Sequence, residues 1–395
     1  MSLNLDKSTW KRVAFGDVIE SITDRVDDPS KAGVDRYVGL EHLDPGVLTV
    51  ERWDTPDKVA AQKLRFQPGD VIFGRRRAYQ KKVARADFVG ICSAHALVLR
   101  AKPDAIDPDF LPVFLASDYF LDRAVSISVG SLSPTVNWRD LKVEEFDLPP
   151  LYEQKRIAQT LWAVADTRQA LVSERTHLAR AKDAWLEAKL RESFSKSHTT
   201  LGDLATQGVV TFLTGPFGST LSAREYVQGG IPIIHPSHIR DDRVTVDSAS
   251  TVTAEKAAAL SRWKVERGDI VLMRKGDVGR SALITSDEAG WILGSDCISV
   301  RVNGASDLDP RYLRLALRSP SAMRILLRNA PGTTMPGINE QSLKPIPVPY
   351  VDPVVQEKTL MEHESWSFAA RALDDEIAGL EALKQTALRD TGEGI

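Results

Sequence analysis

One cluster of basic side chains follows the strand-like run Asp70–Phe73 in the first half of the sequence. It consists of Arg75, Arg76, Arg77, Tyr79, Lys81 and Lys82. A smaller cluster in the second half, after the run Asp269–Met273, consists of Arg274, Lys275 and Arg280. Arginine can bridge O6 and N7 of guanine, and Arg and Lys both bind phosphates. A basic run at a strand end is ordinarily only solvated surface. Because the cluster recurs, we interpret both copies as contacts to a nucleic acid.

Polar loops that contain glycine are the second kind of candidate. Gly130–Asn137 and Gly332–Asn339 occur at matching positions of the two halves. Their short hydrogen-bonding side chains are Ser131, Ser133, Asn137, Thr333, Thr334 and Asn339. Glycine lets the backbone approach a phosphate closely, although each loop could equally be a turn before the next helix. The tight loop Gly215–Ser219, with Phe217 and Ser219, is open to the same two interpretations.

Signatures of catalysis are missing from the sequence. It has no G-x-x-x-x-G-K-[ST] phosphate loop. The segment nearest to the Asn/Asp-Pro-Pro-aromatic motif of adenine methyltransferases is Asp147–Tyr152, which has Leu before the prolines and is interpreted as a helix start. His42 and His238 have no carboxylate or Cys at ligand spacing nearby, so we expect structural histidines. We therefore expect no catalytic residue, no metal site and no cofactor bound by this chain.

An internal repeat of about 200 residues places these candidates in equivalent positions. Phe66–Ile72 corresponds to Val265–Val271, and Leu40–Leu43 corresponds to Pro236–Ile239. Ile106–Leu111, Gly130–Asn137 and Gln154 have counterparts that all lie 202 residues later. Each match alone is weak, but their common order is not expected by chance. The sequence therefore predicts two similar domains.

Each repeat begins with short β-type runs, separated by Gly, Pro and Asp turns. These runs are Asp70–Phe73, Ala96–Arg100, Asp269–Met273 and Cys297–Val302. Helical stretches follow at about residues 108–125 and 309–328. The pattern predicts an α+β fold with two β-rich domains in a pseudo-two-fold arrangement. We expect the first domain at 1–150, a long helix at 151–197, the second domain at 198–350 and a C-terminal helix and tail at 351–395.

The long helix should carry one apolar seam, because residues 153–194 contain neither Gly nor Pro. The seam repeats every seven residues at Ile157, Val164, Leu171, Leu178 and Trp185, with Leu161 on the same face. A less regular stripe in the C-terminal helix comprises Leu360, Phe368, Leu373, Ile377, Leu380 and Leu383–Leu388. A single seam cannot be buried alone, so we expect the helices to pair as an antiparallel coiled-coil spacer. The alternative is two amphipathic helices packed on separate domains.

Composition limits the possible settings of the chain. Its 395 residues carry a net charge of −3, so composition permits DNA binding without indicating it. Acidic residues are concentrated after residue 352, whereas residues 151–199 are net positive, which favours pairing of the helices. Cys92 and Cys297 lie in apolar runs typical of buried thiols in a reducing compartment. No apolar stretch suits a membrane span or a signal peptide, so we expect a cytoplasmic protein.

Several segments resemble the specificity subunits of type I restriction–modification systems. They are Phe146–Ile157, Tyr37–Leu43, Gly69–Arg75, Gly215–Ser219 and Gly230–Ile234. The resemblance covers essentially the whole chain, because it includes the repeat, the domain order and both helices. The second helix start, Val348–Glu357, departs from the pattern: it keeps Pro349 and Gln356 and lacks the Pro-Pro-Leu and Glu-Gln pairs.

The resemblance implies a DNA-specificity subunit that is not itself an enzyme. Each target-recognition domain would read one half of a bipartite, asymmetric site in double-stranded DNA. The helices would set the gap between the half-sites and dock two adenine-methyltransferase subunits, with Glu153, Gln154, Arg156 and Gln356 as docking candidates. Restriction and translocase subunits could join this core. S-adenosylmethionine, ATP and Mg²⁺ would be used by these partners.

Two other functions stay open at this point. The chain could be a nuclease or methyltransferase with a dispersed site, in which case the purified chain would cleave or methylate DNA. It could instead be a protein–protein scaffold whose domains bind no DNA. Neither the target bases nor the presence of a restriction subunit follows from one sequence.

Overall fold

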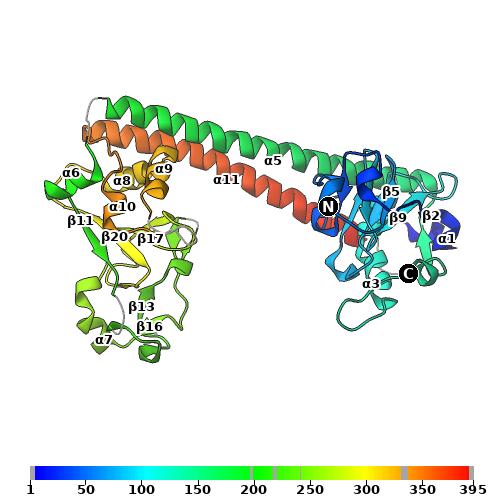
Figure 1. The fold of residues 1–395 in the computed structure, drawn as a ribbon, viewed down its shortest axis with the longest axis horizontal. Helices are drawn as coiled ribbons and strands as arrows, with labels where there is room; N and C mark the ends of the chain where they lie inside the picture. The colour runs from blue at the N-terminus through cyan, green and yellow to red at the C-terminus, as the bar shows by residue number, and fades with distance from the viewer. Residues whose placement is uncertain (1–4, 196–198, 217–219, 241, 331–336, 391–395) are drawn as a thin grey trace. The chain divides into compact units, whose positions relative to one another are not determined.

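The computed structural model describes residues 5–195, 199–216, 220–240, 242–330 and 337–390. The chain divides into two compact units, of which the first comprises residues 1–174 and 372–395 and the second residues 175–371. Both divisions fall inside the long helices α5 (Leu151–Phe194) and α11 (Pro353–Asp390). Each unit is therefore a β-rich domain together with the adjoining part of both helices (Figure 1).

Two twisted sheets and a strand pair form the β part of the first unit. The first sheet has the order β2-β9-β6-β7, with all neighbours antiparallel (Ile19–Ile22, Leu97–Ala101, Val71–Phe73, Val83–Arg85). The second sheet has the order β3-β5-β8-β4, and its last pair is parallel (Arg25–Val26, Lys63–Phe66, Gly90–Ser93, Tyr37–Val38). Strands β1 (Lys11–Ala14) and β10 (Glu145–Leu148) pair separately. The predicted strands at 70–73 and 96–100 correspond to β6 and β9.

The second unit repeats this arrangement. One sheet has the order β11-β20-β17-β18, all antiparallel (Val210–Thr214, Cys297–Val302, Ile270–Met273, Ser281–Leu283). The other has the order β12-β16-β13-β19 and again ends in a parallel pair (Tyr226–Val227, Thr251–Val252, Ile231–Ile234, Ile292–Leu293). Strands β14 (Ile239–Arg240) and β15 (Arg243–Val244) form a short ribbon. The predicted α+β class with two similar β-rich domains is confirmed.

Short helices complete both units. The α-helices are α1 (Phe15–Val18), α2 (Phe110–Ala116), α3 (Asp118–Ser126), α4 (Trp138–Leu141), α6 (Leu201–Thr206), α7 (Ala254–Ala259), α8 (Pro310–Leu317), α9 (Pro320–Arg328) and α10 (Glu340–Leu343). The 3₁₀ helices are η1 (Lys7–Thr9), η2 (Pro29–Lys31), η3 (Leu40–His42), η4 (Pro56–Lys58), η5 (Ala78–Gln80), η7 (Ala223–Glu225), η8 (Pro236–His238) and η9 (Ser261–Trp263).

Each predicted helical stretch at 108–125 and 309–328 is in fact two helices. The break falls at Ser117 in the first unit and at Ser319 in the second, 202 residues apart. Each serine has extended backbone and caps the second helix, accepting a hydrogen bond from the amide of Phe120 or Ala322. Pro320 adds a second stop, because proline is compatible with the first turn of a helix and not with its interior. Hydrophobic periodicity alone did not separate the two helices.

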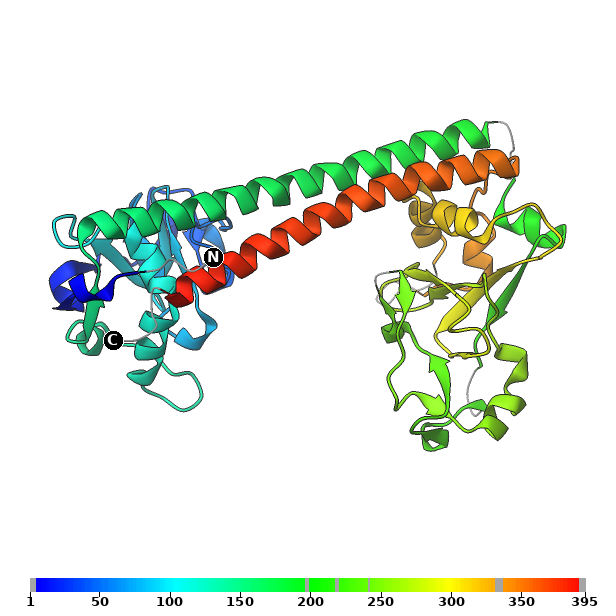
Figure 2. The ribbon, with the colours of Figure 1, turned by 180° about the vertical axis from the view of Figure 1, so that it is seen from behind.

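The two long helices pack on each other in both units, antiparallel as predicted (Figure 2). In the second unit Lys182 Nζ donates to Ser367 Oγ at 2.9 Å, and Lys189 and Glu362 form an ion pair at 2.9 Å. In the first unit Arg168 pairs with Glu381 at 3.0 Å. These pairs support the expected attraction between a net positive and a net negative helix.

Burial along the seam is uneven. Ile157 and Leu161 are fully buried because they also enter the core of the first unit. Val164, Leu171 and Leu178 are only half-buried. In α11 the prediction for Phe368 was wrong, since its side chain is 69% exposed. The side chains that face the other helix are Trp366, which packs on Trp185, and Ala370, which is buried. Residues four positions apart lie on the same face of a helix, so Trp366 and Ala370 share a face from which Phe368 points away.

Several buried contacts recur between the two units. Asp70 is 1% exposed and accepts two hydrogen bonds from Arg100, at 2.7 and 2.9 Å. Asp269 is equally buried and accepts two from Arg301, both at 2.7 Å. Each carboxylate also accepts the amide hydrogen of the residue three positions earlier, at 2.8 Å. The repeated Gly-Asp sequence therefore closes the turn before β6 and β17.

Candidate nucleic-acid interface

The basic cluster and the polar loop of the first unit, predicted as separate features, lie side by side. Beyond the end of β6 the chain continues extended, and Arg76 forms an antiparallel bridge with Thr135. Arg77 N donates to the Pro134 carbonyl at 2.7 Å, and Val136 N donates to the Arg75 carbonyl at 3.0 Å. An isolated bridge thus joins the loop to the segment that follows β6. Residues about 60 positions apart therefore form one surface.

Local backbone geometry fixes this surface. Val129 and Thr135 exchange two backbone hydrogen bonds of 3.0 Å, which close the loop around its tip. Gly130 adopts a φ of +112°, a conformation that favours glycine. Arg77 and Lys81 both have positive φ, at 57° and 53°, and flank η5. Left-handed backbone at a non-glycine residue is uncommon and persists where the surroundings hold it.

Arg76 and Arg77 are exposed cations of this surface, and unlike the exposed Lys81 they form no ion pair with a described carboxylate. Both reach Ser133 Oγ only at the long end of hydrogen bonding, 3.4 and 3.3 Å. Tyr79 is 51% exposed beside them. These guanidinium groups are therefore presented to solvent and are held in place by weak contacts, which is suitable for binding an anionic backbone.

The other basic residues of the cluster have internal roles. Lys81 forms an ion pair with Asp118, and Lys82 Nζ donates to the Leu40 carbonyl at 2.6 Å. Arg75 is half-buried, and its Nε is enclosed without a hydrogen-bond partner. The six-residue cluster thus contributes two exposed arginines and one tyrosine to the surface.

Two exposed residues of this surface were not among the candidates. Leu132, at the loop tip beside Ser131, is 91% exposed. His95 is exposed, and its carbonyl accepts the Arg76 amide at 3.4 Å. Burial lowers the pKa of His95, and the charges of Arg76 and Arg75 lower it further. No sequence signal identified His95, because it belongs to the turn between β8 and β9 and approaches the cluster only in the fold.

The second unit pairs the same two segments. Lys275 forms an antiparallel bridge with Gly337, and Ile338 N donates to the Arg274 carbonyl at 2.9 Å. The Arg274 side chain reinforces the junction by donating to the carbonyls of Ile338 and Ser295, both at 3.1 Å. Arg274 is therefore part of the framework in this conformation.

Charges differ between the two surfaces. In the second unit Lys275 pairs with Asp296 at 3.1 Å, and Arg280 pairs with Asp277. Asp296 belongs to the turn before β20, and His95 occupies the turn before the equivalent strand β9. The first surface consequently carries uncompensated positive charge, and the second presents paired charges.

The remaining loop candidates have mixed outcomes. Asn339 caps α10 by accepting the Ser342 amide at 3.0 Å. Asn137 occupies the equivalent N-terminal position of α4, where its amide approaches Asp140 at 3.4 Å. Both asparagines therefore serve the alternative interpretation, a turn before a helix. Phe217, Ser219, Thr333 and Thr334 lie outside the described residues.

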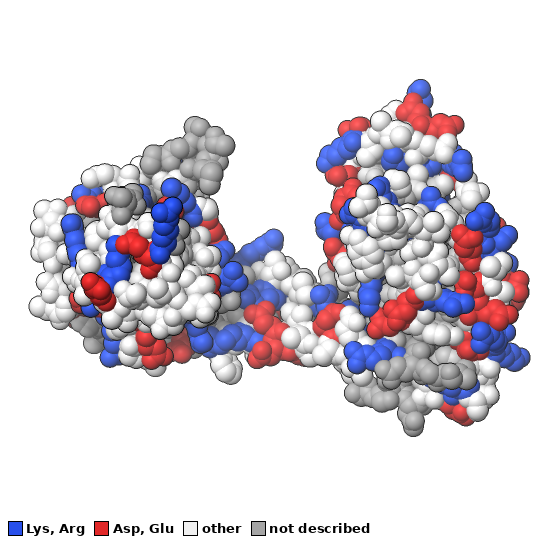
Figure 3. All heavy atoms as spheres, turned by 90° about the horizontal axis from the view of Figure 1, so that it is seen from below, with Lys and Arg blue, Asp and Glu red and all other residues white. Residues whose placement is uncertain are grey.

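Positive and negative side chains are interspersed on the visible face of each unit (Figure 3). No broad basic field dominates that view, in agreement with the net charge of −3. Contact with an anionic polymer would then depend on a few exposed cations, such as Arg76 and Arg77, and not on a general surface potential.

Comparisons with known proteins agree with this duplicated architecture. The type I restriction modification DNA specificity domain matches residues 7–176. The EcoKI specificity subunit of Escherichia coli strain K12 is 24% identical over 340 residues, which cover 80% of this chain and 71% of that subunit. The EcoDI specificity subunit of Escherichia coli is 28% identical over 171 residues, 42% of this chain and 38% of that subunit. The chain thus spans less than two-fifths of the EcoDI subunit it matches.

Residues 7–176 are thus similar to the DNA specificity domain of type I systems, and the similarity to the EcoKI specificity subunit extends into the second half of the chain. A chain from a solved type I restriction–modification system has the same fold, with a TM-score of 0.64, 20% identity and 98% of both chains covered. This likeness confirms the fold along the whole chain.

The two glutamines that recur at the helix starts, Gln154 and Gln356, have structural roles. Gln154 is 2% exposed; its Oε1 accepts the Asp107 amide and its Nε2 donates to the Pro149 carbonyl, both at 2.8 Å. Gln356 makes the equivalent bonds to Asp309 and Val351. Both side chains are used inside their own repeat, which accounts for their recurrence without a partner protein.

The other residues at the helix starts differ in exposure. Glu153 is buried and receives a hydrogen bond from the exposed Arg156 at 3.3 Å. Tyr152 is 69% exposed in the first repeat, and Val354, its counterpart 202 residues later, is 76% exposed. The repeat that aligns Gln154 with Gln356 also aligns Tyr152 with Val354. The sequence therefore contains this apolar pair, but only the structure shows that both side chains are exposed.

Histidines at the aligned positions hold loops together. His42 Nδ1 accepts the Gly39 amide at 2.9 Å, and His238 Nδ1 accepts the His235 amide at 3.1 Å. Their Nε2 atoms approach Asp54 at 3.6 Å and Asp247 at 3.9 Å. Among the described residues no group of His, Cys, Asp and Glu is arranged to hold a metal ion. No described helix is long and apolar enough to cross a membrane.

Proposed function

We propose that this chain is the DNA-reading subunit of a type I restriction–modification complex. The paired strand end and loop of each unit contacts one half of a bipartite site in double-stranded DNA. One observation carries this proposal: a basic strand end and a glycine-containing loop are joined by the same backbone pairing in both repeats, at Arg76–Thr135 and at Lys275–Gly337.

The contact surfaces of the two units differ in their electrostatics. Arg76 and Arg77 present uncompensated charge, so the first unit makes the stronger phosphate contacts. Lys275 must break its ion pair with Asp296 before it can bind a phosphate, so charge contributes less to DNA affinity in the second unit. Because the two surfaces are chemically different, the chain reads an asymmetric target.

The long helices set the gap between the half-sites and dock the partner subunits. An α-helix of 44 residues is about 66 Å long, roughly two turns of B-DNA. Tyr152 and Val354 provide equivalent apolar positions at the start of each helix, so that two copies of one methyltransferase subunit bind. Exposed aromatic and apolar side chains are typical anchors of protein interfaces.

The partner subunits catalyse the reactions of the complex in this proposal. Adenine methylation with S-adenosylmethionine and any ATP- and Mg²⁺-dependent restriction occur on other subunits, and this chain supplies specificity. The complex acts on chromosomal and invading DNA in the cytoplasm.

The decisive experiment is an adenine-methylation map of the host genome with this gene intact and disrupted. Loss of one bipartite, asymmetric methylated motif on disruption supports the proposal and gives both half-sites. Restoration by the intact gene, and not by a frame-shifted copy, excludes effects of the disruption on neighbouring genes.

The same experiment separates the alternatives. An unchanged map, in a host where the chain and its methyltransferase subunits are expressed, contradicts the DNA-reading function and favours a scaffold. Methylation or cleavage by the purified chain alone identifies an enzyme with a dispersed site.

A further inference from the structure

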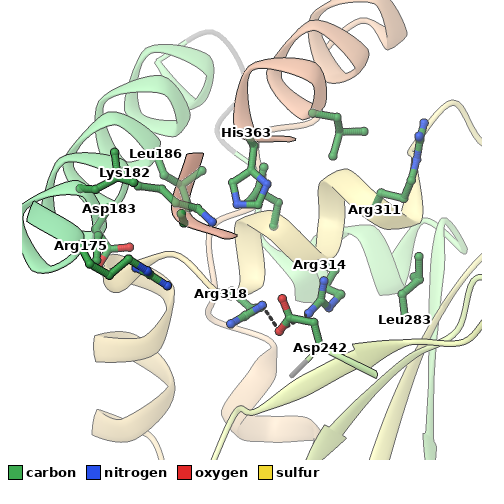
Figure 4. Close-up of a pocket in the computed structure, with 15 residues that line it drawn as sticks. Arg175, Lys182, Asp183, Leu186, Asp242, Leu283, Arg311, Arg314, Arg318 and His363 are labelled. Carbon is green, nitrogen blue, oxygen red and sulfur yellow. Dashed lines mark hydrogen bonds and ion pairs between the residues drawn. The ribbon is translucent and has the colours of Figure 1, made fainter. Parts of the chain in front are cut away.

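A basic cavity of about 320 Å³ lies within the second unit, where α8 meets both long helices (Figure 4). Lys182 of α5, His363 of α11 and Arg314 of α8 extend toward the same space. The cations that line it are Arg175, Lys182, Arg311, Arg314 and Arg318, and the carboxylates are Asp183 and Asp242. Arg311 is paired with Asp309 and Glu357, which lie outside the lining. Even without Arg311, cationic side chains exceed acidic ones around the cavity.

The only carboxylate seen to bridge cations within the lining, among the described residues, is Asp242. It pairs with Arg314 at 2.7 Å and with Arg318, and its φ is +66°, a left-handed backbone held in place by these contacts. Burial raises the pKa of Asp242, but Arg314 and Arg318 lower it by more. One negative charge thus serves two guanidinium groups.

Lys182 and His363 line the side of the cavity that the two long helices form. Lys182 Nζ donates to the neutral hydroxyl of Ser367. Burial lowers the pKa of Lys182, and Arg318 lowers it further. Burial, together with the charges of Lys182, Arg318 and Arg314, lowers the pKa of His363 to about 4. Positive neighbours disfavour the protonated form of each group, and a bound anion would favour it.

Packing does not require these charges, as the first repeat demonstrates. At the offset of 202 residues, Arg314 corresponds to Pro112, Arg318 to Ala116 and His363 to Leu161. Leu161 belongs to the apolar core of the first unit, Ala116 packs against that core, and Pro112 is buried in α2. The first unit has its own cavity beside α2 and α5, but four carboxylates and only two cations line it: Asp87, Asp107, Asp109 and Asp166 with Arg85 and Lys155. An excess of cations is therefore particular to the cavity of the second unit. Holding cations close together costs free energy. Their presence where the first repeat has uncharged residues therefore indicates a function.

We propose that this cavity binds one small phosphate-class anion, either inorganic phosphate or the phosphate of a mononucleotide. Arginine suits such ligands because its planar donors match their oxygens, and Lys182 adds a point charge from the opposite helix. Bound between α5, α8 and α11, the anion would tie the second recognition domain to its helix pair. This proposal is independent of the DNA-reading function.

The test is binding of inorganic phosphate to the full chain by isothermal titration calorimetry, with chloride replaced at constant ionic strength. We expect saturable binding at one site per chain and a rise in the melting temperature of the second unit. Removing one charged hydrogen-bond donor, in Lys182→Gln or Arg318→Gln, should weaken binding about tenfold or more. The control Arg328→Gln removes an exposed cation of α9 and should leave binding unchanged.

A second variant guards against loss of folding. Arg318→Ala with His363→Leu introduces the residues of the first repeat at equivalent positions. This variant should keep a cooperative transition and lose its response to phosphate. Adenosine monophosphate in place of phosphate distinguishes the two ligand sources, since tighter binding identifies a nucleotide site. Equal phosphate binding by wild type and all variants overturns the proposal, as does stoichiometric displacement of phosphate by duplex DNA, which would place the cavity in the DNA interface.

Discussion

Replacing Arg76 and Arg77 with alanine tests the first contact surface most directly. Both guanidinium groups are exposed and weakly held, so the folded unit loses little when they are removed. If each binds one phosphate, the slope of log K against log salt should fall by about 1.8 units. Between about 50 and 200 mM salt, the affinity advantage of the wild type should then shrink by roughly tenfold.

The assay is fluorescence anisotropy of a labelled duplex carrying the methylated motif, with the chain assembled with its methyltransferase subunits. A matched control is Lys11→Ala with Arg12→Ala, which removes the same charge from β1. The control should keep the wild-type slope. A double variant of Arg76 and Arg77 that binds more weakly with an unchanged slope would refute phosphate contact. Unchanged affinity and slope would remove this surface from the interface.

Four further outcomes are expected. Asp70→Asn should lower the free energy of unfolding of the first unit by about 2–3 kcal/mol, because it breaks a buried two-fold hydrogen-bonded ion pair. Asp269→Asn should act on the second unit alone, and calorimetry would show which transition shifts; a common shift contradicts this division. His363 has a folded pKa of about 4 against 6.5 when unfolded, so the unfolded chain binds the proton more readily. The second unit should therefore lose about 2–3 kcal/mol as pH falls through this window, and His363→Asn should abolish that dependence in acid melts. Tyr152→Glu with Val354→Glu should prevent co-purification of the methyltransferase subunits without changing the melting temperature; retained subunits would exclude these positions. Deleting one heptad from each long helix should shorten the gap in the methylated motif by about three base pairs, and a constant gap would show that the helices are not the ruler.

Local patterns were sufficient to predict much of the fold. The seven-residue seam predicted α5, and the Gly-Asp turns predicted the strands β6 and β17. The strands β4 and β19 have two residues each, which is too short to show the alternation of apolar and polar residues that marks a strand. Their pairing is set by contacts distant in sequence. The breaks at Ser117 and Ser319 were missed because a capping serine changes hydrophobic periodicity very little.

The sequence predicted which residue types form the candidate site, but not which residues they contact. Arg76 and Arg77 were correctly expected at a strand end, but no local rule joins them to a loop near Thr135. The ion pairs of Lys81 with Asp118 and of Lys275 with Asp296 also depend on the completed fold. A basic residue is therefore a candidate for contact in the sequence, and only the structure distinguishes an exposed cation from a compensated one.

Recurrence between the repeats requires a different interpretation from the one that the sequence suggested. Positions that recur with the same partners, such as Gln154 with Gln356 and Asp70 with Asp269, are buried and build the framework. Framework contacts must recur because both units share one fold. A reader of an asymmetric site needs the opposite property, different side chains on equivalent backbone. Base specificity should therefore reside where the repeats diverge on a shared scaffold, as at His95 and Asp296, and not where they agree.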